Sequence, residues 1–256
     1  MKRTLIELKA KGWLCRGVPT VYDNLLPSID RPPKNKPRAT LSYKEKLSRE
    51  RASINLVRSI SKYHSELPLE IRESDRLALA WMRHYGVPTR LLDWSRSPYI
   101  AAFFATAKEG DDGDLWAFDY EQYLRKGDEQ WKCIEDAMDR TTGKDVFQFD
   151  STAFQLGRPP EKNWIVCLFY EPQYFPRHNA QQGFYTVAAN LGTDHAIKLA
   201  ELLKDEAYFC RYRIASRIKA EVQLHLRECH GVWSGTVYPD LAGTMSEVKS
   251  TLFGEF

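Results

Sequence analysis

The side chains of one short segment, residues 84–98, are the strongest candidates for chemistry in this chain. The segment reads HYGVPTRLLDWSRSP and joins two helical patterns. It concentrates an imidazole, two guanidinium groups, a carboxylate, an indole and three aliphatic hydroxyls beside apolar residues. A connection that only reverses the direction of the chain needs no such collection, so we expect this one to carry function.

Asp93 is the carboxylate of this segment and lies next to Trp94. An indole partly desolvates a neighbouring carboxylate and raises its pKa unless a cation such as Arg90 or Arg96 offsets the effect. Asp93 is therefore either a catalytic acid or base, or one half of an Arg90–Asp93 ion pair that rigidifies the turn. His84, at the end of a predicted helix, is either a cap or a base.

An anion site is predicted where this segment meets the next helix. Pro98 suits the first turn of a helix that Ser97 caps. The backbone N–H groups of a helix N-terminus attract anions. Thr89, Ser95 and Arg90 stand shortly before this helix, so they are candidates to contact a phosphate group.

Arg16 is a second candidate because it ends a strand predicted over residues 12–17, just before Gly17. Glycine permits a close approach of backbone or ligand, and a guanidinium group pairs with planar anions such as phosphate. The alternative is an arginine at the edge of the core that pairs with a carboxylate.

The segment 177–183, RHNAQQG, is rich in side-chain amides and stands between two predicted strands. Amides such as that of Gln181 can recognise a nicotinamide carboxamide or the edge of a base through paired hydrogen bonds. A loop held by amide-to-backbone hydrogen bonds explains the same composition. Arg177, at its start, is a further candidate for ligand binding.

Composition and motifs exclude several classes of protein. The chain has 256 residues, 43% of them hydrophobic and 28% charged, and a net charge of +3, which is ordinary for a soluble globular protein. Five scattered cysteines without Cys-x-x-Cys spacing favour reduced thiols, a cytoplasmic location and no zinc module. There is no apolar run for a membrane span, no glycine-rich nucleotide motif and no metal-ligand spacing, so we expect no membrane and no metal.

A basic segment is the one strong charge asymmetry. Residues 33–51 hold seven Lys or Arg and two Glu, a balance of +5. The segment is either a solvated loop leading into a surface helix or a patch that faces the phosphates of a nucleic acid or a pyrophosphate ligand.

The pattern of elements predicts one mixed α+β domain over residues 1–256, with helices around an antiparallel or mixed central sheet. A helical insertion over about 33–85 follows the first strand, and a β-rich half covers about 113–256. The continuous β-prone run 164–170 predicts a central strand buried on both faces. The further expected elements are helices at 41–64, 75–84, 99–107, 120–140, 194–204, 216–229 and 245–252, and strands at 114–119, 183–187 and 207–214.

These motifs resemble the FRG domain family. The run HYGVPTRLLDW at 84–94 is its signature, and WLCRG at 13–17 stands where the family has its Phe-Arg-Gly triplet. Two positions depart from the pattern, because Cys15 replaces the aromatic residue and Val18 a frequent Gln. The resemblance continues through AQQGFY at 180–185 and YPDLAG at 238–243, so it covers nearly the whole chain.

The order of elements is also similar to that of ADP-ribosyltransferase folds, which implies an NAD- or nucleotide-using enzyme, an ADP-ribosyltransferase or NAD glycohydrolase. On this analogy Arg16 grips the pyrophosphate or ribose, and Thr89 and Ser95 line a nicotinamide pocket. Trp94 or Tyr85 stacks on the ring. NAD is then the substrate, and such an enzyme would suit a toxin or a phage-defence effector.

In the same analogy Asp93 or Gln181 stabilises the oxocarbenium-like transition state. The alternative is a non-enzymatic module that binds a nucleic acid, a nucleotide or a protein through Arg16, Arg90 and the basic segment 33–51. The residues predicted to form the site are the catalytic Arg16, Asp93 and Gln181 and the ligand-binding His84, Tyr85, Thr89, Arg90, Trp94, Ser95 and Arg177.

Overall fold

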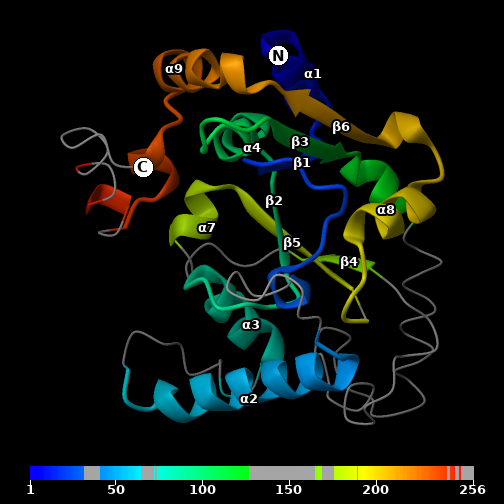
Figure 1. Cartoon of the computed structure of the whole chain (residues 1–256), viewed down its shortest axis with the longest axis vertical. Helices are drawn as coiled ribbons and strands as arrows, with labels where there is room; N and C mark the ends of the chain where they lie inside the picture. The colour runs from blue at the N-terminus through cyan, green and yellow to red at the C-terminus, as the bar shows by residue number, and fades with distance from the viewer. Residues whose placement is uncertain are drawn as a thin grey trace.

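An antiparallel sheet of six strands forms the centre of the described part of the chain (Figure 1). The computed structural model describes residues 1–31, 41–64, 72, 74–126, 165–168, 176–188, 190–240, 243–245 and 248. The strand order is β4-β5-β2-β1-β3-β6, and every neighbouring pair is antiparallel. The strands are β1 Leu14–Val18, β2 Leu92–Ser95, β3 Gly113–Phe118, β4 Ile165–Leu168, β5 Gly183–Ala188 and β6 Phe209–Ile214.

Helices cover the sheet and extend beyond it, which confirms the predicted α+β class. The helices α1, α4 and α9 lie at one end of the molecule, and α2 and α3 lie together at the other end (Figure 1). The helices are α1 Lys2–Lys11, α2 Tyr43–Ser61, α3 Asp75–His84, α4 Pro98–Ala105, α7 Pro176–Ala180, α8 His195–Leu203, α9 Lys219–His230 and α10 Ser234–Val237. The described part of the predicted helical insertion thus consists mainly of α2 and α3.

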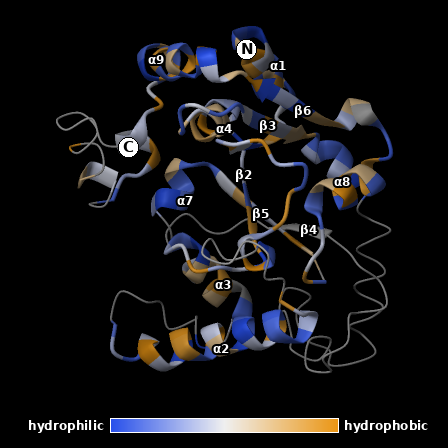
Figure 2. Ribbon diagram, viewed as in Figure 1, coloured by the Kyte–Doolittle hydropathy of each residue, from blue (hydrophilic) through white to orange (hydrophobic). Residues whose placement is uncertain are grey.

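Alternating side chains on β1 separate two hydrophobic cores. Leu14 packs with Trp94 and Phe118 on the face covered by α8. Cys15 packs with Ala101 and its neighbours on the face covered by α1, α4 and α9. Hydrophobic residues predominate in β5 and α4, whereas α9 carries both hydrophilic and hydrophobic residues (Figure 2). None of the helices in the described ranges is long and apolar enough to cross a membrane.

Serine caps start the two helices that flank the signature, and the sequence predicts the one at Ser97. The Ser74 hydroxyl accepts a hydrogen bond from the backbone N–H of Leu77 at 3.2 Å, and α3 begins at the next residue. The Ser97 hydroxyl accepts one from Ile100 at 3.4 Å, and Pro98 occupies the first turn of α4. Both helix starts are therefore encoded locally.

The sequence interpretation of the signature as a connector is wrong in one respect. Residues Leu92–Ser95 form strand β2, which lies inside the sheet between β1 and β5. A four-residue strand with a charged member shows no clear alternation, so the polar content of the segment concealed it. The helices α1, α7 and α10 were also not predicted.

The expected central strand at 164–170 is wrong as well. Among the described strands, β4 stands at the edge of the sheet and pairs with β5 alone. Periodicity cannot tell a strand buried on both faces from a short apolar strand at an edge. The C-terminal part of the expected helix at 120–140 and most of the expected helix at 245–252 lie outside the described residues.

Gly17 allows α4 to pack directly on β1. A Cβ atom at this position would lie 1.8 Å from the carbonyl oxygen of Ala101 and 2.6 Å from the backbone nitrogen of Ala105. Neither atom belongs to a flexible side chain, so the contact cannot be relieved locally. The glycine of the Arg16-Gly17 pair is thus explained by the packing of α4 on β1.

The substitution Gly17→Ala is expected to lower the free energy of unfolding by about 3 kcal/mol, because α4 must separate from β1. Urea unfolding followed by circular dichroism measures the change. The matched control is Gly12→Ala, where φ is +67° and no atom lies within 4 Å of the added Cβ. That control should lose only about 1 kcal/mol from backbone strain, and equal losses for the two variants would contradict the packing explanation.

Candidate active site

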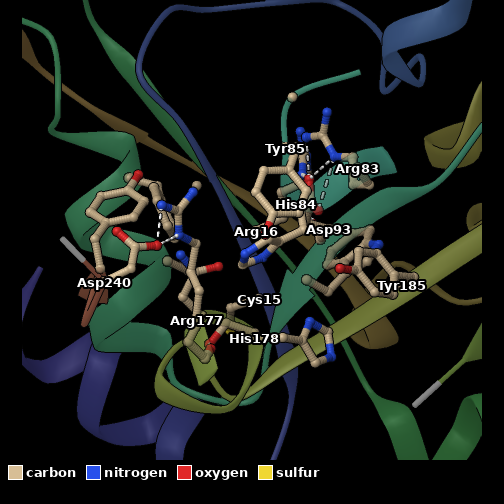
Figure 3. A pocket seen from close by; sticks show the side chains of 18 residues that line it. Cys15, Arg16, Arg83, His84, Tyr85, Asp93, Arg177, His178, Tyr185 and Asp240 are labelled. Atoms are coloured by element: carbon tan, nitrogen blue, oxygen red, sulfur yellow. Dashed lines mark hydrogen bonds and ion pairs between the residues drawn. The ribbon is translucent and has the colours of Figure 1, made fainter. Parts of the chain in front are cut away.

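A cavity of about 760 Å³ opens beside β1 and β2 and collects most of the predicted site residues (Figure 3). Its wall combines the two strands with the end of α3, with α4 and α7, and with the segment after α10. Eight of the ten predicted residues line it, namely Arg16, His84, Tyr85, Asp93, Trp94, Ser95, Arg177 and Gln181. The sequence thus indicates the location of the cavity although these residues come from segments far apart in the chain.

Arg16 bridges β1 and β2 at the wall of this cavity. The two strands pair only at Cys15 and Ser95, and beyond this pair the Arg16 Nη1 atom donates to the backbone oxygen of Asp93 at 2.7 Å. The Arg16 side chain is only 9% exposed, and its buried Nε atom has no hydrogen-bond partner among the described residues. Burial lowers the pKa of Arg16 to about 10, so the group stays cationic at neutral pH.

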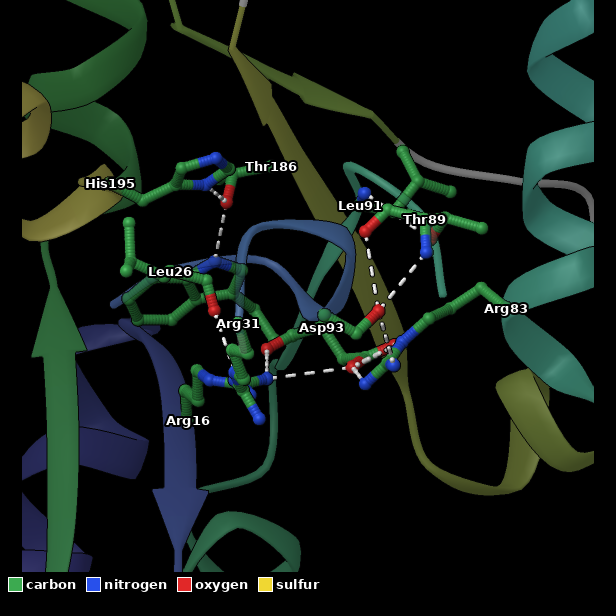
Figure 4. Close-up of polar contacts among 11 residues, drawn as sticks. Arg16, Leu26, Arg31, Arg83, Thr89, Leu91, Asp93, Thr186 and His195 are labelled. Atoms are coloured by element: carbon green, nitrogen blue, oxygen red, sulfur yellow. Dashed lines mark hydrogen bonds and ion pairs between the residues drawn. The ribbon is translucent and has the colours of Figure 1, made fainter. Parts of the chain in front are cut away.

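Arg83 is the main partner of the Asp93 carboxylate, and the sequence interpretation missed it. Its Nε atom lies 3.0 Å from Oδ1 and 2.9 Å from Oδ2 of Asp93, and its Nη2 atom also contacts Oδ2 (Figure 4). Arg16 Nη1 makes a longer contact to Oδ2 at 3.5 Å. Two arginines therefore share one carboxylate, and this triad of Arg16, Arg83 and Asp93 has a net charge of +1.

The pKa of Asp93 is lowered, because cations offset the effect of burial, although these are Arg83 and Arg16 and not Arg90 or Arg96. Burial alone would raise it, but the charge and hydrogen bond of Arg83 and the charge of Arg16 outweigh burial and lower the pKa to about 2. Asp93 is thus ionised at neutral pH and cannot donate a proton there. Its side chain is 40% exposed, so it offers the cavity a hydrogen-bond acceptor.

The predicted Arg90–Asp93 ion pair is wrong, because Arg90 binds a carboxylate on α2 instead. Arg90 Nε lies 2.8 Å from Oε1 of Glu50, and both side chains are at most 5% exposed. Thr89 is fully buried, and its backbone N–H donates to Ser28 at 3.0 Å. Neither Thr89 nor Arg90 lines the cavity. Arg90 instead fastens α2 to the segment before β2, and Thr89 joins that segment to Ser28.

The N-terminus of α4 does not form the predicted anion site. The Ser97 hydroxyl is occupied as a cap and Pro98 has no N–H, while the part of α4 that lines the cavity is Ala101 and Phe104. Ser95 reaches the cavity wall, but its hydroxyl donates to the Gln181 backbone oxygen at 2.7 Å. Its observed contacts join β2 to the turn after α7.

Two aromatic residues of the signature differ in burial, because Trp94 lies in the core and Tyr85 is exposed. Trp94 is 3% exposed, its Nε1 atom donates to Thr186 at 2.9 Å, and its ring packs edge-on against Phe118. Trp94 is therefore a core residue and not the predicted stacking platform. Tyr85 is 65% exposed and stacks on Trp81 with ring centroids 5.5 Å apart, which leaves it as the open aromatic surface at the cavity.

A second ion pair lies on the opposite wall. Arg177 Nε donates to Oδ2 of Asp240 at 2.9 Å, and the guanidinium carbon lies 4.9 Å from the centre of the Tyr238 ring. Gln181 Nε2 donates to the backbone oxygen of Val237 at 3.3 Å. These contacts hold the segment after α9 against α7 and so complete the cavity.

A family model matches the part of the chain that contains the triad. Its match spans residues 11–114. The matching model is that of the FRG domain. No curated protein and no solved structure matches the chain.

The match confirms the resemblance over β1, α3, β2 and α4, which hold Arg16, Arg83 and Asp93. The extension of the FRG resemblance to 180–185 and 238–243 lies beyond the matched residues and stays a prediction. The Arg177 wall of the cavity also lies beyond them. Within the described residues, no three His, Cys, Asp or Glu side chains are grouped to hold a metal ion.

The pH dependence of stability tests the triad of Arg16, Arg83 and Asp93. The pKa of Asp93 is about 2 in the folded state and 3.8 as the ordinary value, so ionisation stabilises the fold above about pH 4. This stabilisation is lost as the pH falls toward 2. We expect Asp93→Asn to lower the free energy of unfolding at pH 7 and the deficit relative to wild type to shrink across this window.

Urea unfolding at pH 7, 4 and 3 measures this deficit. The exposed Asp23→Asn serves as the control and should show no comparable trend. A deficit for Asp93→Asn that is the same at all three values would contradict the ion-paired state of Asp93.

The buried Arg90–Glu50 pair gives a second prediction. Arg90→Met should lower the free energy of unfolding by about 3–5 kcal/mol, because the carboxylate of Glu50 stays buried without its partner. The double variant Arg90→Met with Glu50→Leu removes both charges and should recover much of that loss. A double variant less stable than the single one, measured by urea unfolding, would contradict the structural role of the pair.

Proposed function

We propose that the cavity of this FRG domain binds a nucleotide and that Arg16 holds one of its phosphate groups. The observation that carries the proposal is the Arg16 guanidinium group, which lines the cavity, is 9% exposed and has a buried Nε without a partner in the described part of the chain. A guanidinium group in a water-poor site binds phosphate strongly through charge-assisted hydrogen bonds. Arg83 adds to the positive charge of the triad.

The size and the aromatic lining of the cavity support a ligand that also carries a ring. A volume of about 760 Å³ falls within the range of small-molecule sites, roughly 300–1,000 Å³. Tyr85 offers an exposed face that Trp81 holds in place by stacking. Aromatic side chains bind bases and nicotinamide rings through such faces.

Cleavage of NAD is the second candidate function, and Asp93 and Gln181 favour it. Both residues line the cavity, and an ionised carboxylate stabilises the positive charge that develops on ribose when a glycosidic bond breaks. Each lining carboxylate, Asp93 and Asp240, is paired with an arginine. Nucleotide binding is therefore better supported than cleavage of NAD. A role as a toxin or phage-defence effector would follow only if the protein cleaves NAD.

Recognition of a nucleic acid or protein by the basic segment 33–51 has less support. Part of this segment lies outside the described residues, and none of its described residues lines the cavity. Lys46 pairs with Asp30 at 2.9 Å. The basic segment and the cavity are thus separate candidates for partners.

Calorimetric titration with NAD and ADP-ribose tests the proposed function. We expect both to bind the wild-type protein, and Arg16→Ala to bind roughly 10- to 100-fold more weakly because a charge-assisted contact is lost. Arg16→Lys retains the positive charge but lacks the planar guanidinium group. Its affinity should fall between those of the wild-type protein and Arg16→Ala. The control Arg96→Ala removes an exposed arginine of the same segment that packs on Phe184 outside the cavity, and its affinity should equal that of wild type.

Nicotinamide release from NAD, measured by chromatography, separates the two candidate functions. Release that depends on Asp93 supports cleavage, and binding without release leaves a nucleotide-binding domain. Failure of both ligands to bind, or equal affinities for Arg16→Ala and Arg96→Ala, would contradict the proposed function.

A further inference from the structure

Asp93 is the most exposed member of the triad. Its side chain is 40% exposed, whereas those of Arg16 and Arg83 are 9% and 23% exposed. All three residues line the cavity. The group that this part of the wall presents to a ligand is therefore chiefly a carboxylate, although the triad as a whole is cationic.

The hydrogen bonds of Asp93 leave one of its oxygen atoms largely available. Oδ2 accepts from Arg83 and also lies near Nη1 of Arg16. Among the side chains of the described residues, Oδ1 accepts from Arg83 Nε alone, at 3.0 Å. Each carboxylate oxygen has about two acceptor positions, so Oδ1, with a single side-chain donor, can accept a further hydrogen bond from a ligand.

Asp240, the second carboxylate of the cavity, is less exposed than Asp93, at 34% against 40%. Its Oδ2 atom accepts from Arg177 and its Oδ1 atom accepts from the backbone N–H of Gly243 at 2.8 Å. The two acidic residues are therefore not equivalent. Asp93 is the stronger candidate to contact a ligand through its carboxylate.

An ionised carboxylate accepts hydrogen bonds but repels a phosphate group. The part of a nucleotide that matches it is the pair of ribose hydroxyl groups, two adjacent donors that can contact one carboxylate together. We infer that Asp93 binds the 2′- and 3′-hydroxyls of ribose, so that the ligand class is a ribonucleotide rather than a 2′-deoxynucleotide. This inference rests on the proposed nucleotide site and adds to it the group that selects the sugar.

The same arrangement distributes the ligand across the triad. Arg16 carries the buried Nε atom and faces the phosphate, while Asp93 faces the sugar. Arg83 fixes the carboxylate through its contacts to both oxygen atoms. Arg83 is accordingly a positioning residue, and a ligand with a phosphate on the 2′-oxygen would be excluded by the charge of Asp93.

Calorimetric titration of the wild-type protein with AMP, 2′-deoxy-AMP, 3′-deoxy-AMP and pyrophosphate tests the inference. We expect AMP to bind roughly 10-fold more tightly than either deoxy compound, because each lacks one hydrogen bond to a charged acceptor. The affinity for pyrophosphate, which has no ribose, should not depend on Asp93. In Asp93→Asn the preference for AMP should fall below about 3-fold while pyrophosphate still binds, whereas the control Asp111→Asn, an exposed carboxylate paired with Lys108, should keep the preference.

The outcomes separate the two claims. Equal affinities for AMP and both deoxy compounds in the wild-type protein would overturn the ribose inference and leave the phosphate site standing. Absence of binding for AMP and pyrophosphate alike would overturn the proposed function and the inference with it. Equal affinities in the wild-type protein overturn the inference by themselves, so it can be contradicted even where Asp93→Asn does not fold. A preference for AMP that Asp93→Asn retains would also contradict it.

Discussion

The shared carboxylate of Asp93 is the interaction on which the rest of the site depends. It joins Arg16 on β1, Arg83 at the end of α3 and its own strand β2. Because β1 and β2 have a single paired position, the hydrogen bond from Arg16 to the backbone of Asp93 connects the strands where the ladder does not. The charges that hold the strands together are thus also the charges that line the cavity.

The histidines near the triad have lowered pKa values, so they add little positive charge at pH 7. Burial, together with the charge of Arg177, lowers the pKa of His84. Burial lowers the pKa of His178 to about 4 and that of His195 to about 3. Nδ1 of His195 contacts the Thr186 hydroxyl (Figure 4). The same hydroxyl accepts a hydrogen bond from Trp94, so this network beside the triad is neutral at pH 7. The positive charge of the triad therefore belongs to its arginines at physiological pH.

Local signals determined how much could be predicted from the sequence. The caps Ser74 and Ser97 define α3 and α4 from neighbouring residues alone, and both helices were predicted. Strand β2 was missed because its pairing with β1 and β5 is a long-range feature that a polar four-residue segment does not reveal. Arg83 was missed for a related reason, because its position on α3 resembles that of any basic residue in a last helical turn.

The functional residues follow the same division. Membership in the signature correctly predicted that Tyr85 and Asp93 line the cavity. It predicted the same for Arg90, which instead pairs with Glu50, 40 residues earlier in the chain. The most direct test of the account is a crystal structure of the protein with bound AMP. The account predicts the phosphate within hydrogen-bond distance of the Arg16 guanidinium group and the ribose hydroxyls at Asp93. A ligand bound outside the cavity, or one whose phosphate contacts only Arg177, would contradict it.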